Sequence, residues 1–237
     1  MWITTDRGVR LAAEVREGDA VVVMAHGFCS DRHSRGRFDR LADDFTDLGL
    51  GVVRFDFSGC GESDDDVVTA ANEVADLRAA LAFTRGLGAR RIALHGHSLG
   101  ASICLQAYDE GIATLVLTGG ATGPMHYDWS EHYSAEQLDQ LRRTGFMRDG
   151  RHLLSSETLR EFEERDQDAL LGPIKCPMLL IHGDGDPEER ELLRLSRRAT
   201  LPEGSRLTVV HGAPHSFEGH LDEVSALARA WYREHLR

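Results

Sequence analysis

The sequence lacks the features of proteins that bind nucleic acids or associate with membranes. Its 237 residues contain 27 Lys and Arg against 39 Asp and Glu, which gives a formal net charge of −12. Binding to a phosphate backbone or to anionic lipid headgroups needs an excess of basic residues, so this charge balance disfavours both kinds of partner. The longest apolar run, residues 20–25, is far shorter than the ~18 residues that span a bilayer. The polar start, residues 1–10, predicts no targeting segment.

Cysteine is also scarce, and its spacing excludes two further classes of protein. The four cysteines stand at positions 29, 60, 104 and 176, with no C-x-x-C pair. Neither a zinc site nor a disulfide framework is therefore predicted. A chain of this length buries enough surface to fold without such bridges, and reduced thiols favour the cytoplasm. We expect a cytoplasmic protein with no metal, no cofactor, and no nucleic-acid or membrane partner. The sequence leaves its oligomeric state open.

Short apolar runs alternate with helical periodicities along the chain. Strands are predicted at residues 9–15, 20–25, 51–55, 91–94, 113–117, 177–181 and 206–210, and helices at 34–48, 69–85, 99–108, 187–199 and 221–236. Nearly continuous apolar strands suit a sheet that is covered on both faces. The alternation predicts an α/β fold with a mostly parallel, doubly wound sheet.

One long segment, between residues 117 and 177, interrupts this alternation and shows no strand pattern. Ser134 and Gln137 have the spacing of a capping box, and Ser156 is predicted to cap a second short helix. A structureless loop of this length is unusual in a compact domain. We therefore expect residues 1–121 and 173–237 to form the core and residues 122–172 a small helical lid inserted after the sixth core strand.

The pentapeptide Gly96–Gly100 follows a predicted strand and opens a predicted helix. In that setting G-x-S-x-G is a nucleophile elbow, a strained turn that exposes the Oγ of Ser98. The N–H of Leu99, at the helix N-terminus, is then available to an oxyanion. Ser98 is the predicted nucleophile.

A serine nucleophile needs a base and an orienting acid, and two later strands end in suitable residues. The strand at 177–181 leads into Asp184 and Asp186, and the strand at 206–210 leads into His215. In a parallel sheet these ends meet at the same edge as Ser98. The chain order Ser98, Asp186, His215 fits a catalytic triad. Asp184 remains an alternative acid, and His211 and His220 remain alternative bases.

With these motifs, His26-Gly27-Phe28 and the stretch 54–63, the chain resembles the α/β-hydrolases over nearly its whole length. It is most similar to small bacterial esterases of the cinnamoyl/feruloyl type. The resemblance implies an α/β-hydrolase fold, with Ser98 as nucleophile, His215 as general base and Asp186 as acid. It also implies that the N–H of Phe28 is the second oxyanion donor, and that its ring lines the pocket. The chain departs from its relatives at Pro187, which follows Asp186 directly.

The expected activity is that of a serine hydrolase that cleaves a small-molecule carboxylic ester through an acyl-enzyme, without a cofactor. A thioesterase, or an acyltransferase on a biosynthetic acyl intermediate, would use the same triad. A catalytically silent binding module would lack a triad member, and none is missing here.

Two features bear on the substrate. Aromatic and Met side chains of the lid segment either form its core or wall an apolar pocket that includes Phe28; they are Met125, Tyr127, Trp129 and Phe146. The basic loop 31–37 either pairs with nearby carboxylates or clamps an acidic substrate group.

Overall fold

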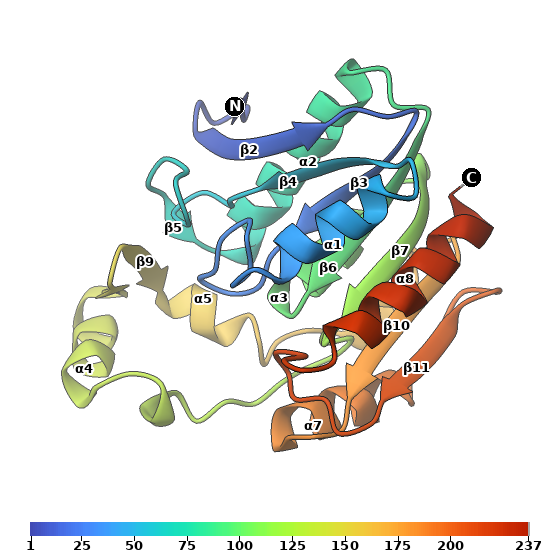
Figure 1. The fold of residues 1–237 in the computed structure, drawn as a ribbon. Coiled ribbons are helices and arrows are strands. Elements are labelled where there is room, and N and C mark those ends of the chain that lie inside the picture. The colour runs from blue at the N-terminus through green and yellow to red at the C-terminus, as the bar shows by residue number, and fades with distance from the viewer. Residues whose placement is uncertain (237) are drawn as a thin grey trace.

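The computed structural model describes residues 1–236, which are built around an eight-stranded sheet (Figure 1). Its strands run in the order β1-β2-β4-β3-β6-β7-β10-β11. They are β1 (Trp2–Thr4), β2 (Arg10–Arg16), β3 (Ala20–Ala25), β4 (Gly51–Phe55), β6 (Arg91–His97), β7 (Ile112–Thr118), β10 (Met178–Gly183) and β11 (Arg206–Val210). Only the pairs β1–β2 and β2–β4 are antiparallel. The predicted mostly parallel sheet is confirmed, and the short edge strand β1 is an addition.

The apolar runs form central strands because both of their faces are buried. In β3, Val21 and Val23 belong to one apolar cluster, whereas Val22 and Met24 belong to another on the opposite side of the sheet. All four side chains are nearly inaccessible to solvent. The alternation of side chains along a strand therefore supplies two cores, one for each layer of helices.

Helices cover both faces of this sheet. In Figure 1, α1 (Arg37–Thr46) and α8 (Leu221–His235) lie in front of it, and α2 (Ala70–Gly86) lies behind it with α3 (Leu99–Ala107). The front layer is the more aromatic, and its fully buried rings are Phe38, Phe45, Trp231 and Tyr232. A further helix, α7 (Pro187–Ser196), follows β10 and packs against it. All five predicted helices are present, with ends that differ by a few residues.

The segment between β7 and β10, which we call the lid segment, leaves the sheet at the carboxyl end of β7. It contains the 3-10 turn η1 (Trp129–Glu131) and the helices α4 (Ala135–Thr144), α5 (Ser156–Arg160) and α6 (Gln167–Leu171). The predicted capping box of Ser134 and Gln137 is present at the start of α4. The predicted cap of the second helix is one residue off, because Ser155 caps α5 and Ser156 is its first residue.

The expectation that the lid segment contains no strand is wrong. Strands β8 (Phe146–Asp149) and β9 (His152–Ser155) form a hairpin, and β9 pairs with β5 (Val67–Val68) in a second, three-stranded sheet. Gly150, with φ of 56°, allows the tight turn between β8 and β9. This pairing fastens the lid segment to the loop after β4, beside the edge of the main sheet that carries the candidate site.

Every helix within residues 1–236 is too short or too polar to span a lipid bilayer.

Candidate active site

Ser98 lies on a strained turn between β6 and α3. Its φ of 55° and ψ of −122° are unusual for a residue with a side chain. The main-chain N–H of Ser98 donates to the carbonyl oxygen of Thr118 at 2.9 Å, which fixes the turn against β7. A Cβ on Gly100 would lie 2.2 Å from the carbonyl oxygen of Ala25, and one on Gly96 would lie 2.6 Å from Cα of Ala101. The two glycines of the motif are therefore required by the close approach of neighbouring backbone.

His215 lies on the loop after β11 and contacts Ser98 directly. Its Nε2 is 2.9 Å from the Oγ of Ser98, and its side chain is 21% exposed. The other ring nitrogen, Nδ1, is 2.6 Å from Oε1 of Glu189. The structure thus brings together the predicted nucleophile and the predicted base, and adds a carboxylate that the sequence analysis did not select.

Glu189 lies in the first turn of α7 and is completely buried. Its Oε2 accepts a hydrogen bond from the main-chain N–H of Gly183 at 2.8 Å and lies 3.3 Å from Nδ1 of His182. Burial alone would raise the pKa of Glu189, but hydrogen bonds from His182 and His215 outweigh it, so the pKa is lowered. Glu189 is therefore a carboxylate at neutral pH.

The charge of Glu189 also acts on the imidazole of His215. Burial alone would lower the pKa of His215, but the hydrogen bond to Glu189 and the nearby charge of Glu188 raise it above its ordinary value. A histidine between a carboxylate and a serine hydroxyl has the arrangement of a general base.

The expectation that Asp186 contacts the imidazole is wrong. Its Oδ1 accepts a hydrogen bond from the main-chain N–H of Glu189 at 2.8 Å, and its Oδ2 accepts one from the main-chain N–H of His215 at 2.6 Å. The physical reason is Pro187, which starts α7 immediately and makes Asp186 the N-cap. The carboxylate that reaches the ring then comes from one turn further along the helix.

Asp184, the alternative acid, is also engaged elsewhere. Its oxygens accept from the main-chain N–H of Gly212 at 2.6 Å and contact Nδ1 of His211 at 2.8 Å. The alternative bases do not reach Ser98 either: the His211 side chain is 86% exposed, and His220 stands at the start of α8.

The main-chain N–H groups of Leu99 and Phe28, the two predicted oxyanion donors, have no acceptor among residues 1–236. Leu99 is the first residue of α3, so its N–H has no acceptor within the helix. Phe28 lies in the turn after β3, and no acceptor for its N–H is found among residues 1–236. The turn is supported by His26, whose Nδ1 donates to the carbonyl oxygen of Gly27 at 2.8 Å and whose Nε2 accepts from the N–H of Phe57 at 3.0 Å.

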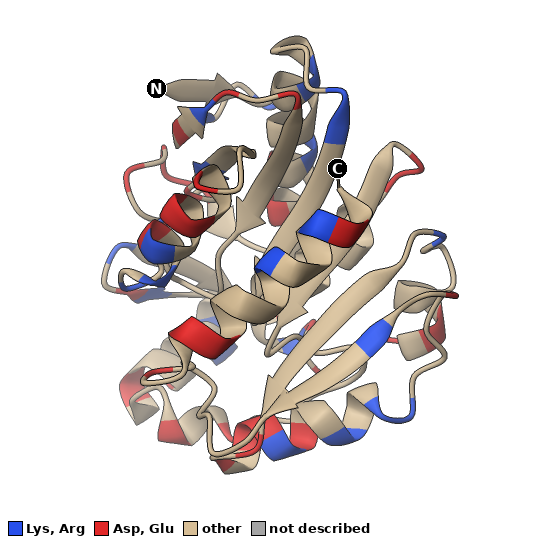
Figure 2. Cartoon of the chain, turned by 45° about the vertical axis from the view of Figure 1, so that its right-hand side comes forward, with Lys and Arg blue, Asp and Glu red and all other residues tan. Residues whose placement is uncertain are grey.

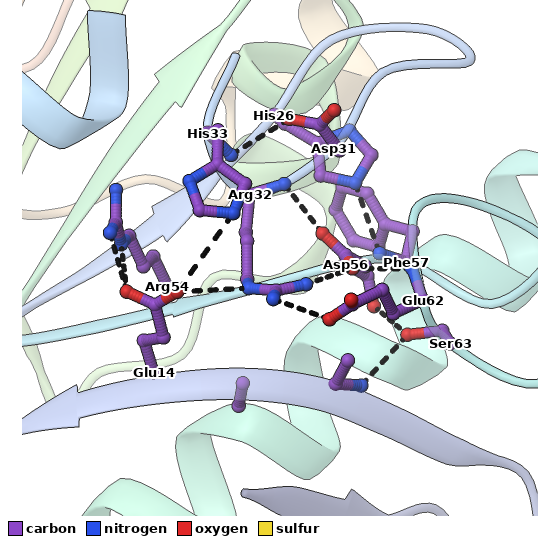
Figure 3. A network of polar contacts seen from close by, with 12 residues as sticks. Glu14, His26, Asp31, Arg32, His33, Arg54, Asp56, Phe57, Glu62 and Ser63 are labelled. Carbon is purple, nitrogen blue, oxygen red and sulfur yellow. Dashed lines mark hydrogen bonds and ion pairs between the residues drawn. The ribbon is translucent and has the colours of Figure 1, made fainter. Parts of the chain in front are cut away.

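The loop that follows this turn is held by a network of ion pairs (Figure 3). The guanidinium of Arg32 contacts Oδ2 of Asp56 at 2.5 Å, Oε2 of Glu62 at 2.5 Å and Oε1 of Glu14 at 3.3 Å. The main-chain N–H of Arg32 also donates to Oδ1 of Asp56 at 2.6 Å. Asp56 is fully buried just after β4, so the network ties the loop to the sheet. For Arg32, the expected pairing with nearby carboxylates is confirmed.

Two cavities meet at Ser98. The first, of about 500 Å³, is lined mainly by polar and basic side chains, among them Arg35, Arg37, Arg151 and His152. The second, of about 400 Å³, is lined by aromatic side chains of the lid segment, among them Tyr127, Trp129, Tyr133 and Phe162, and also by the acidic residues Asp149 and Glu188. Phe28, Cys29, Arg35 and Ser98 line both cavities.

Three of the five residues expected in the substrate pocket line these cavities, namely Phe28, Tyr127 and Trp129. The expectation for the other two is wrong. Phe146 is 46% exposed, because the alternation of β8 turns Met147 inward and Phe146 outward. Met125 is buried in a small apolar cluster with side chains of α7 and lines neither cavity among the described residues.

No group of three or more His, Cys, Asp or Glu side chains that could hold a metal ion is found in residues 1–236. Cys29 lies beside the candidate site, but burial raises the pKa of its thiol, which disfavours the thiolate that a nucleophile requires.

Curated proteins similar to this chain have names of two kinds, a transferase and hydrolases. Among curated proteins, it is 28% identical over 226 residues to "Putative phosphoribosyl transferase Rv0571c" of Mycobacterium tuberculosis, with 91% of this chain and 41% of that protein covered. It is also 31% identical over 109 residues to a 2-hydroxy-6-oxononadienedioate/2-hydroxy-6-oxononatrienedioate hydrolase of Burkholderia vietnamiensis, with 45% of this chain and 38% of that protein covered. The chain thus spans less than half the length of these two relatives.

Among solved structures, the ferulic acid complex of Est1E from Butyrivibrio proteoclasticus superposes with a TM-score of 0.79 at 17% identity, over 99% of this chain and 98% of that one. At this identity the likeness establishes the fold alone. The model of the alpha/beta hydrolase family matches residues 22–230. Since this match covers most of its length, the chain belongs to the alpha/beta hydrolase family.

Proposed function

We propose that the protein is a serine hydrolase that cleaves a carboxylic ester through an acyl-enzyme on the triad Ser98, His215 and Glu189. One observation carries the proposal: the imidazole of His215 contacts the Oγ of Ser98 through Nε2 at 2.9 Å and the carboxylate of Glu189 through Nδ1 at 2.6 Å. Such a chain of contacts lets a serine hydroxyl attack at neutral pH.

In the first half of the reaction, Ser98 Oγ attacks the ester carbonyl carbon while His215 Nε2 takes its proton. Glu189 holds the imidazole with the proton on Nδ1 and stabilises the imidazolium that forms. The N–H groups of Phe28 and Leu99 donate to the oxyanion of the tetrahedral intermediate. The intermediate collapses to the acyl-enzyme, and the alcohol leaves with the proton from His215.

In the second half, a water molecule gives its proton to His215 and attacks the acyl carbonyl. The second tetrahedral intermediate releases the acid and returns the proton to Ser98. Each step uses the same base and the same two N–H donors, so the site needs no further group for hydrolysis.

We further propose that the enzyme acts in the cytoplasm and that residues 122–172 act as its lid. The four cysteines are unpaired, and three of them are buried, as expected where thiols stay reduced. The lid residues Tyr127 and Trp129 wall the second cavity, which suits an apolar acyl or alcohol group.

The test is a panel of p-nitrophenyl esters and matched acyl thioesters, assayed with the purified protein and with Ser98→Ala. We expect ester hydrolysis by the wild type and a loss of about 10⁴-fold or more in kcat in the variant. Rates on the thioesters that exceed those on the esters would favour a thioesterase. Ester hydrolysis that survives in Ser98→Ala would refute the mechanism.

A further inference from the structure

The basic loop 31–37 places two arginines beside Ser98 that have no carboxylate partner. Arg32, the third arginine of the loop, contacts three carboxylates. Within residues 1–236, no ion pair is found for Arg35 or Arg37. Both side chains line the first cavity together with Ser98 and His215.

Arg37 is held in place by neutral oxygen atoms. Its Nη1 donates to the carbonyl oxygen of Ser216 at 2.8 Å, its Nε to the carbonyl oxygen of Ser34 at 3.1 Å and its Nη2 to Oγ of Ser34 at 3.0 Å. Burial, with Arg35 nearby, lowers the pKa of Arg37 to about 10, so the guanidinium remains charged at neutral pH. Its position is therefore fixed while its charge is not neutralised by the protein.

Arg35 is presented by an unusual stretch of backbone. Ser34, Arg35 and Gly36 have successive φ angles of 48°, 57° and 85°, immediately before α1. Such angles are unfavourable for Ser and Arg and persist only where the surrounding structure maintains them. The result is that Arg35 lies where the two cavities meet, since it lines both.

The other charged groups of the first cavity do not neutralise these two. Asp31 is the single carboxylate among its described lining residues, and it accepts hydrogen bonds from the main-chain N–H groups of His33 at 2.8 Å and Ser34 at 2.9 Å. Arg151 is paired with Asp65 at 2.9 Å. The sequence has 39 Asp and Glu against 27 Lys and Arg, and Figure 2 shows these residues in red and blue along the chain. What distinguishes Arg35 and Arg37 is their place, since both line the cavity that contains Ser98 and His215.

We propose that the first cavity binds an anionic group of the substrate, and that this group is a carboxylate recognised by Arg35 and Arg37. The inference rests on the proposed ester hydrolysis and names its substrate class. The substrate is an ester with a carboxylate on one side of the scissile bond and an apolar group on the other, where the aromatic second cavity receives it. Guanidinium groups bind carboxylates through charge-assisted hydrogen bonds, which suits this assignment.

The experiment compares kcat/KM on two pairs of matched esters. One pair varies the acyl half, as p-nitrophenyl hydrogen glutarate against p-nitrophenyl pentanoate. The other varies the alcohol half, as 3-carboxyphenyl acetate against 3-methylphenyl acetate. We expect the carboxylated member of at least one pair to be preferred by about tenfold or more.

Arg35→Gln is the informative variant, because Arg35 is exposed and holds no other side chain, whereas Arg37 also supports the loop of His215. We expect it to lose about 10-fold to 100-fold on the preferred carboxylated ester and much less on its neutral partner. Arg35→Lys should recover part of the loss. The matched control is Arg90→Gln, which removes the same charge just before β6, at the opposite end of the strand from Ser98, and should leave both rates unchanged.

The outcomes separate the two proposals. Hydrolysis of the neutral esters that depends on Ser98, with no preference for a carboxylate in either pair, would overturn the anionic subsite alone. Equal losses on both members of a pair in Arg35→Gln would do the same. Failure of the wild type to hydrolyse any of the four esters would overturn the proposed function, and the substrate class with it.

Discussion

The replacement of Glu189 by Gln probes the contact that most distinguishes this site. Gln keeps the size of the side chain and an oxygen acceptor for the N–H of Gly183, but it removes the charge 2.6 Å from Nδ1 of His215. An amide at this position can donate to Nδ1 and thereby favour the wrong tautomer of the imidazole. The corresponding change in a serine protease lowers kcat by ~10⁴, or about 5.5 kcal/mol in the activation barrier. We expect a loss of this order in kcat.

Two neighbouring carboxylates provide matched controls. Asp186→Asn keeps a residue that is favourable at the N-cap, but its single amide oxygen can replace only one of the two acceptors for the N–H groups of Glu189 and His215. We therefore expect it to lower the free energy of unfolding by about 1–2 kcal/mol and kcat by less than about tenfold. Glu188→Gln changes the adjacent residue, whose Oε1 accepts from the hydroxyl of Tyr127 at 2.8 Å and lies 3.9 Å from Nε2 of His215. We expect a small change in kcat from it.

The assay is kcat on the best ester of the panel, with circular dichroism to show that each variant is folded. If Asp186→Asn lost ~10⁴ and Glu189→Gln lost little, the acid would be Asp186 and the placement of the imidazole partner derived above would be refuted.

Three further predictions test the pocket, the base and the loop. Trp129 lines the second cavity, so Trp129→Ala should weaken transition-state binding of a bulky aryl-acyl ester by up to ~1–3 kcal/mol and that of an acetyl ester much less, as measured by kcat/KM. Equal losses of kcat/KM on both esters would show that Trp129 only packs within the lid segment. Because carboxylates raise the pKa of His215, activity should fall as pH drops through that raised pKa, and in Glu189→Gln the acidic limb of the kcat/KM profile should move to lower pH; an unmoved limb would contradict the contact. Arg32→Gln removes the guanidinium that pairs with the buried carboxylate of Asp56, and it should lower the free energy of unfolding by about 3 kcal/mol. Arg10→Gln, which removes the exposed ion pair with Asp64, should change that free energy little. Equal effects of the two substitutions in denaturant titrations would contradict a stabilising role of the Arg32 network.

Much of the fold could be predicted because its elements follow from local patterns. The central strands are continuous apolar runs, and Ser134 with Gln137 marks the start of α4 by a capping box. The short strands β5, β8 and β9 could not be predicted in this way. Each is only two to four residues long, and their pairing depends on Val67–Val68 meeting Leu153 and Leu154 from a distant part of the chain.

In the candidate site, too, local patterns predict some residues and not others. Ser98 is set by a local motif, and His215 follows from the place where its strand ends. The identity of the acid depends on how the chain turns after β10. There, Glu189 contacts the imidazole of His215, and Asp186 contacts only its main-chain N–H. A signal was available in the Asp-Pro pair. An aspartate before a helix-starting proline is occupied as the N-cap, so the acid about one helical turn further on, Glu189 and not the intervening Glu188, is placed to reach the ring.

The most direct test of the account is the mass of the intact protein after reaction with a fluorophosphonate, followed by peptide mapping of the modified residue. We predict a single adduct on Ser98 in the wild type, no adduct in Ser98→Ala, and much slower labelling in Glu189→Gln, because the hydroxyl is activated through His215. A folded wild-type protein that hydrolyses esters without forming an adduct, or that carries the adduct on another residue, would contradict the claim that Ser98 is the nucleophile.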